Sequence, residues 1–175
     1  GPVILGTREK VIYGSGYIED VLCGKRFRIS SSSFYQINPV QTEKLYSAAI
    51  GLAGLTGNET VLDAYCGIGT IGLSASDKAK QVIGVEINRD AVNDAIANAR
   101  LNGVKNCWFT VGDAGKYMEQ MAADKVKPDI VFMDPPRAGS DERFLSSLLK
   151  CAPKRIVYIS CNIDTQRRDL DVLLS

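Results

Sequence analysis

The sequence predicts an α/β protein built on a doubly wound parallel sheet, with a small β-hairpin element before it. Five apolar runs, at residues 61–65, 81–87, 107–111, 130–133 and 155–160, alternate with segments of helical periodicity. A glycine-rich turn follows the first of these runs directly. Strands that alternate with helices form parallel sheets with helices on both faces, because each crossover needs a helix to return the chain.

Composition limits the classes of protein to consider. The chain has 175 residues, of which 45% are hydrophobic, enough for one core with an appendage. Five cysteines without a C-x-x-C pair, and no histidine, argue against a disulfide framework and against a metal site. The net charge of +1 gives no overall nucleic-acid signal, and no apolar run is long enough to span a bilayer. We expect a soluble cytoplasmic protein with free thiols, no metal and no membrane contact.

The first 38 residues are expected to form an N-terminal β element and entry segment. Short β-prone runs at residues 11–13, 17–22 and 27–29 are separated by glycines, which predicts an antiparallel hairpin. The pattern changes at Asn38, an N-cap residue followed by Pro39 and a helical repeat that ends at Gly54. We therefore expect a second unit, the α/β domain, over residues 39–175.

Later elements can be placed by the same signals. A helix is expected after Asn88, ending at Gly103, because its apolar residues recur at helical spacing. In doubly wound sheets, ligands bind outside the carboxyl ends of the strands. Polar or reactive residues cluster at the expected strand ends and are predicted to face one crevice: Asp63, Tyr65, Cys66, Glu86, Asp113, Asp134 and Cys161.

The glycine-rich turn suggests a nucleotide-containing ligand. Gly67, Gly69 and Gly72 fit G-x-G-x-x-G, and Glu86 ends the next strand, where a ribose would bind. A dinucleotide such as NAD fits this pattern, and so does a turn that only packs helix against strand. Asp63, an acidic residue inside the preceding strand, favours a cationic ligand over a pyrophosphate.

Two further segments carry candidate chemistry. The pair Pro135-Pro136 stiffens the backbone after Asp134, which fixes the direction of that side chain. Cys161 directly follows the fifth apolar run and comes just before an expected helix, and helix N-termini with nearby arginines favour the thiolate. A cysteine in a strand is more often a small buried hydrophobic residue. The expected position of Cys161 above the crevice favours a nucleophile instead.

Taken together, four motifs resemble one family. Phe34-Tyr35-Gln36-Ile37-Asn38, residues 63–69, Asp134-Pro135-Pro136-Arg137 and Ser160-Cys161-Asn162 occur in the order of the bacterial RNA uracil-5-methyltransferases, nearest to the 23S ribosomal RNA branch. The resemblance implies a Rossmann-like class I fold that binds S-adenosylmethionine, with 23S rRNA as partner. It implies that Cys161 is the nucleophile. The cofactor contacts that it implies are Gln36, Tyr65, Gly67, Gly69, Glu86, Asp134 and, more weakly, Asp113.

The resemblance also implies a mechanism and its missing part. A cysteine thiolate that adds to carbon 6 of uracil makes carbon 5 nucleophilic enough to accept a methyl group. The family's general base is a glutamate in a C-terminal piece, and the sequence ends before it, so we expect cofactor binding with little turnover. An uncovered sheet edge would allow self-association. A non-catalytic S-adenosylmethionine-binding or RNA-binding module and an NAD-dependent oxidoreductase remain as alternatives.

Overall fold

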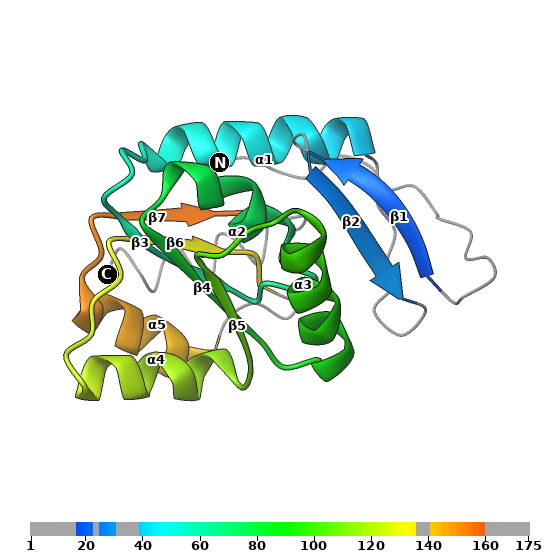
Figure 1. Ribbon diagram of the computed structural model, residues 1–175. Helices are drawn as coiled ribbons and strands as arrows, with labels where there is room; N and C mark the ends of the chain where they lie inside the picture. The colour runs from blue at the N-terminus through cyan, green and yellow to red at the C-terminus, as the bar shows by residue number, and fades with distance from the viewer. Residues whose placement is uncertain (1–16, 23–24, 31–38, 136–140, 160–175) are drawn as a thin grey trace.

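The computed structural model describes residues 17–22, 25–30, 39–135 and 141–159, and its centre is a five-stranded parallel sheet between two layers of helices (Figure 1). The strand order is β5-β4-β3-β6-β7. The sheet strands are β3 (Thr60–Ala64), β4 (Gln81–Glu86), β5 (Cys107–Val111), β6 (Ile130–Met133) and β7 (Arg155–Tyr158). The predicted doubly wound sheet is confirmed.

The helices follow the predicted alternation. They are α1 (Pro39–Ala53), α2 (Thr70–Ala75) with the short 3-10 helix η1 (Ser76–Lys78), α3 (Arg89–Leu101), α4 (Ala114–Ala123) and α5 (Glu142–Cys151). The side chain of Asn88 accepts a hydrogen bond from the Ala91 N–H and caps α3, as its position before the helix predicts. Strand β3 ends one residue before the predicted end because Tyr65 has a positive φ of 59°.

A two-stranded antiparallel hairpin precedes the sheet. Strand β1 (Tyr17–Leu22) pairs with β2 (Lys25–Ser30), with Tyr17 opposite Ser30, so the predicted hairpin is confirmed. Figure 1 shows the hairpin beside α1 and α3, at the opposite end of the molecule from α4 and α5. The predicted strand at residues 11–13 and the capping residue Asn38 lie outside the described residues.

Alternate residues of each strand bury against different helices. Val61, Phe132 and Val157 pack with α1 and α2 on one face of the sheet. Leu62 and Val131 pack with α4 and α5 on the other. Because side chains alternate along a strand, this two-sided burial explains why the strands are apolar runs without a polar alternation.

The chain reverses direction across the sheet at β3. It moves outward from β3 to β4 and β5, with α2 and α3 on one face, then returns to β6 and continues to β7 over the other face. The loops after neighbouring strands therefore diverge at the carboxyl ends of the strands. This divergence leaves room for a ligand there.

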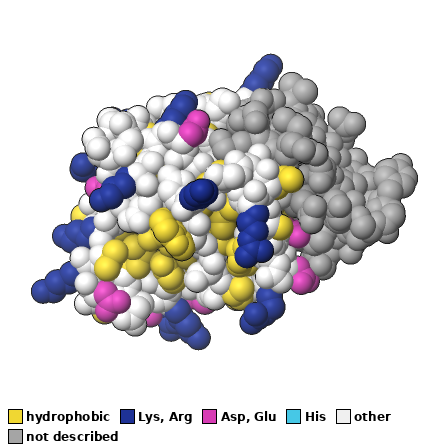
Figure 2. Space-filling model, in the orientation of Figure 1, with side chains coloured by type: hydrophobic (Ala, Val, Ile, Leu, Met, Phe, Trp, Pro, Cys, Tyr) yellow, Lys and Arg dark blue, Asp and Glu magenta, His cyan; other side chains and the backbone are white. Residues whose placement is uncertain are grey.

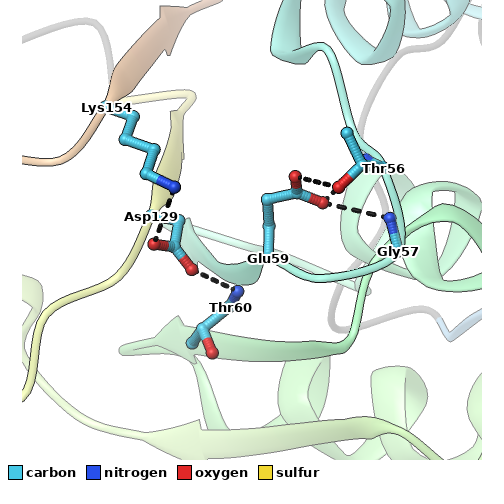
Figure 3. A network of polar contacts seen from close by, with 6 residues as sticks. All are labelled: Thr56, Gly57, Glu59, Thr60, Asp129 and Lys154. Carbon is cyan, nitrogen blue, oxygen red and sulfur yellow. Dashed lines mark hydrogen bonds and ion pairs between the residues drawn. The ribbon is translucent and has the colours of Figure 1, made fainter.

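At the opposite end of the sheet, where the strands begin, two carboxylates hold neighbouring segments together (Figure 3). Glu59 accepts hydrogen bonds from the Thr56 N–H at 2.8 Å and the Thr56 hydroxyl at 2.7 Å. These bonds lower the pKa of Glu59 to about 2. Asp129 accepts a hydrogen bond from the Thr60 N–H at 2.9 Å and lies 3.8 Å from the Lys154 Nζ. These contacts fix the start of β3 against the starts of β6 and β7.

Within the described part of the chain, no helix has the length and apolar character that crossing a membrane would require.

The contact between β4 and β5 at Gly84 gives a stability prediction. A Cβ at Gly84 would lie 2.4 Å from the Phe109 Cδ1, so Gly84→Ala forces a partly buried aromatic ring to move. We expect Gly84→Ala to lower the free energy of unfolding by about 1–3 kcal/mol. Gly51→Ala in α1, where nothing lies within 4 Å, is the control and should raise it by about 0.5 kcal/mol. Urea unfolding followed by circular dichroism measures both, and an unchanged Gly84→Ala stability would contradict the packing.

Candidate functional site

A cavity of about 240 Å³ opens at the carboxyl ends of β4 and β5. Three residues from the predicted strand ends, Tyr65, Glu86 and Asp113, line it. The remaining lining residues are Val85, Ile87, Gly112, Ala114 and Asp141. The structure thus brings together side chains that follow three different strands, as the fold requires of a ligand site.

The carboxylate of Glu86 fixes the loops around this cavity. Its Oε1 accepts a hydrogen bond from the Gly67 N–H at 3.1 Å, and its Oε2 accepts one from the Asn88 N–H at 2.7 Å. The Glu86 backbone carbonyl accepts a third bond from the Gly112 N–H at 2.9 Å. Each carboxylate oxygen has a second lone pair, so Glu86 can still accept hydrogen bonds from a ligand.

The three glycines of the turn serve different purposes. Gly67 has a φ of +55°, and a Cβ there would meet nothing within 4 Å, so its backbone lies beside open space. Gly69, with a φ of +84°, packs closely against Phe109 and Ala95, where a Cβ would lie 3.0–3.1 Å from both side chains. A Cβ at Gly72 would lie 2.7 Å from the Asp63 Oδ2. Of the three glycines, only Gly67 has open space where a Cβ would stand.

Two aspartates of the cavity also begin helices. Asp113 accepts a hydrogen bond from the Lys116 N–H at 2.8 Å and caps α4. Asp141 accepts one from the Phe144 N–H at 2.7 Å and caps α5. A Cβ at Gly115 would lie 2.9 Å from Asp141 Oδ1 and 3.1 Å from Asp113 Oδ1, so the two carboxylates approach the same point. Both caps leave one carboxylate oxygen for another donor.

Five lining residues were not among the predicted site residues, and two of them, Ile87 and Asp141, shape the cavity with their side chains. Ile87 directly follows Glu86 and is 71% exposed, which gives the cavity an apolar wall. Asp141 could have been found as an N-cap, because Phe144, Leu145 and Leu148 follow it at helical spacing.

Asp63 and Asp134 are carboxyl groups whose ionisation is suppressed. Burial, with a smaller contribution from the neighbouring Asp134, raises the pKa of Asp63 to about 8. Burial also raises the pKa of Asp134 to about 7. Asp63 Oδ2 accepts a hydrogen bond from the Gly72 N–H at 3.1 Å, whereas Oδ1 has no hydrogen-bond partner among the described residues. At neutral pH, Asp63 is therefore mostly protonated.

The other predicted crevice residues are placed differently. Asp63 is 1% exposed and lies behind the glycine turn, so it does not face the cavity as predicted. Cys66 is 7% exposed, and burial raises the pKa of its thiol well above the usual value, so it is an inert core residue. Asp134 is half-buried at the end of β6, outside the cavity lining. Cys161 and Gln36 lie outside the described residues.

Comparison with solved structures identifies the fold as that of the class I methyltransferases. A S-adenosylmethionine-dependent methyltransferase from Agrobacterium tumefaciens matches 93% of this chain and 59% of its own, with a TM-score of 0.75 at 17% identity. The Pyrococcus abyssi tRNA (uracil-54, C5)-methyltransferase, solved with S-adenosyl-L-homocysteine, matches 92% of this chain and 38% of its own, with a TM-score of 0.77 at 32% identity.

Sequence comparison then assigns the family. The tRNA (Uracil-5-)-methyltransferase family profile matches residues 3–175, and the chain belongs to this family. An uncharacterized RNA methyltransferase of Halalkalibacterium halodurans is 52% identical over 98% of this chain, and one of Lactiplantibacillus plantarum is 54% identical over 96%. The chain spans 37% of the length of each of these relatives. The predicted membership of the RNA uracil-5-methyltransferases is confirmed.

The raised pKa of Asp63 predicts how stability depends on pH. The folded state holds the Asp63 proton up to about pH 8, whereas the group's usual pKa is 3.8. The folded state thus binds more protons between these values, so the free energy of unfolding should fall as pH rises through this window. Asp63→Asn keeps an acceptor for the Gly72 N–H but cannot ionise, and its stability should fall less.

Thermal unfolding of both proteins between about pH 4 and 8 checks this expectation. Asp90→Asn, at an exposed position in the first turn of α3, is the matched control. Equal pH dependence for Asp63→Asn and the unmodified chain would show that Asp63 is ionised in the folded state.

Proposed function

We propose that this chain is the cofactor-binding and nucleophile-bearing part of an RNA methyltransferase that transfers a methyl group from S-adenosylmethionine to carbon 5 of a uridine. The observation that carries the proposal is the cavity at the ends of β4 and β5, where Glu86 is fixed by the Gly67 and Asn88 N–H groups. Membership of the uracil-5-methyltransferase family supports the choice of reaction.

The residues of the cavity fit S-adenosylmethionine. Glu86 would accept the ribose hydroxyls with its remaining lone pairs, and the open backbone at Gly67 would allow close approach of the ligand. Ile87 would contact the adenine ring, and Asp113 would accept from the adenine amine. Tyr65, Gly69, Asp134 and Gln36 complete the proposed cofactor site.

The charge of the site favours this cofactor over a dinucleotide. Glu86, Asp113 and Asp141 line the cavity, and within the described part of the chain neither a lysine nor an arginine lines it. A pyrophosphate would bring further negative charge to these carboxylates, whereas a sulfonium brings a positive charge. Family membership argues in the same direction against an NAD-dependent oxidoreductase.

Cys161 would carry the covalent chemistry. When bound, S-adenosylmethionine supplies an electrophilic methyl group. The Cys161 sulfur would add to carbon 6 of uracil, which moves the carbon 5–carbon 6 π electrons into an enolate with a nucleophilic carbon 5. After carbon 5 is methylated, loss of its proton to a base lets the bond from sulfur to carbon 6 break and returns the thiolate. Asp134, held by Pro135, would orient the flipped base or the cofactor.

The RNA that we propose as substrate is 23S rRNA, on the resemblance of the four sequence motifs to that branch. The Pyrococcus abyssi relative is named as an enzyme of tRNA, so a tRNA transcript is the direct competitor in any substrate test. We place the nucleophile and every proposed cofactor contact except Gln36 in the methyltransferase domain, residues 39–175. The hairpin and Gln36 belong to the N-terminal element, residues 1–38.

A covalent trap tests the proposed nucleophile. A 5-fluorouridine RNA should form a stable adduct in the presence of S-adenosylmethionine, because fluorine on carbon 5 cannot leave as a proton does and the final elimination stops. We expect a slower-migrating protein band on a denaturing gel with the unmodified chain and none with Cys161→Ser. No general base is needed to reach this adduct.

Cys151→Ser is the matched control, since Cys151 is 1% exposed in α5, and should still form the adduct. An adduct that persists in Cys161→Ser would assign the nucleophile elsewhere. Cofactor binding without any adduct would favour the non-catalytic module.

A further inference from the structure

The edge strand β5 exposes an aromatic surface that the proposed active site does not use. Trp108 is 55% exposed and pairs across the strands with Ile83. Ile83 belongs to the face that α4 and α5 cover, where both Ile83 and the half-buried Tyr117 pack against the same core cluster. Figure 2 shows an apolar patch over β4 and β5, with Lys and Arg side chains around it. We call Trp108, Ile83 and Tyr117 the edge patch.

Lysines gather at the starts of the strands near this patch. Exposed lysines occur in the segments before β4, β5 and β6: Lys78, Lys80, Lys105, Lys125 and Lys127. The same segments hold three aspartates, of which Asp129 is already paired with Lys154. Neither Lys80 nor Lys105 forms an ion pair with another described residue. These charges remain available to an anionic partner.

The backbone joins the turn that holds Lys80 to the turn that holds Lys105, just before β5. The Asn106 side chain donates hydrogen bonds to the Ala79 carbonyl at 3.3 Å and the Lys80 carbonyl at 3.4 Å. The Asn106 carbonyl accepts one from the Val82 N–H at 2.9 Å. The turns that carry the two lysines are therefore joined, and Trp108 follows only three residues after Lys105.

We propose that the edge patch and its lysines form a second RNA-contact surface, on which Trp108 stacks an unpaired base while Lys80 and Lys105 neutralise phosphates. An exposed tryptophan beside lysines is the combination that binds single-stranded nucleic acid. Protein interfaces are instead depleted in lysine. This inference rests on the proposed function for its choice of RNA as partner.

The position of the surface connects it with the cavity. Strand β5 runs from Trp108 to Val111, and Gly112, which follows, lines the cavity. Four residues of strand extend over about 13 Å. An RNA strand that follows the β5 edge would therefore contact Trp108 with one nucleotide while another reaches the cavity end of the sheet. The surface would raise the affinity for RNA and orient the strand toward the cavity, but it would take no part in methyl transfer.

Intrinsic fluorescence tests this directly, because Trp108 is the only tryptophan of the chain. Titration with single-stranded oligouridylate should quench the emission saturably, and added salt should weaken the effect. In the Lys80→Glu/Lys105→Glu double variant, we expect binding about tenfold weaker and a salt dependence reduced by about 1.4 in log–log slope. Lys44→Glu, at an exposed position of α1 on the other face of the sheet, is the control and should change neither.

The tryptophan itself is tested by anisotropy of labelled oligouridylate. Trp108→Ala should weaken binding about tenfold, and Trp108→Phe should restore most of the affinity because a ring remains for stacking. Equal affinity of Trp108→Ala and the unmodified chain overturns the proposal. So does an emission that changes with protein concentration in the absence of RNA, because a second copy would then cover the patch.

The fluorouridine adduct, measured on the same proteins, separates this inference from the proposed function. An adduct without quenching of Trp108 rejects the surface and leaves the methyltransferase function intact. Quenching that depends on Lys80 and Lys105, without an adduct, supports the surface and rejects the covalent mechanism.

Discussion

The carboxylate of Glu86 joins the loops that form the cavity. Its two oxygens accept hydrogen bonds from Gly67 and Asn88, and its backbone carbonyl accepts one from Gly112. One residue at the end of β4 thereby fixes the loops after β3, β4 and β5 in relation to each other. Without this carboxylate, two backbone N–H groups would need other partners, and the open backbone at Gly67 would lose its support.

Carboxyl groups are accommodated differently at the starts and at the ends of the strands. At the starts of the strands, Glu59 and Asp129 are satisfied by hydrogen bonds from Thr56 and Thr60. At the ends of the strands, the carboxyl groups accept fewer hydrogen bonds, and burial raises the pKa of Asp63 and Asp134. Buried carboxyl groups with raised pKa values lower the stability of the fold, and they are common at functional sites.

The sequence predicted the fold well because its signals are local. The predicted bounds of β5 and β6 agree with the observed ones, and Asn88 and Pro39 marked the starts of α3 and α1. The strand ends also identified Tyr65, Glu86 and Asp113 as residues of one cavity.

Side-chain burial was harder to predict than position along a strand. Asp63 and Cys66 lie near the end of β3, as expected, but the glycine turn folds over them and removes them from the surface. Asp141 enters the cavity from α5, far away in sequence, because α5 packs against α4. Such contacts depend on tertiary packing, which no local pattern encodes.

The most direct measurement is the thermal stability of the chain with S-adenosyl-L-homocysteine or with NAD, repeated for Glu86→Gln. A ligand that binds only the folded state stabilises it by about 2.7 kcal/mol at a hundred times its Kd. If the cavity organised by Glu86 holds the methyl donor, S-adenosyl-L-homocysteine alone should raise the Tm, and Glu86→Gln should lose most of that rise. A rise with NAD alone, or an undiminished rise with S-adenosyl-L-homocysteine in Glu86→Gln, would contradict the role assigned to this carboxylate.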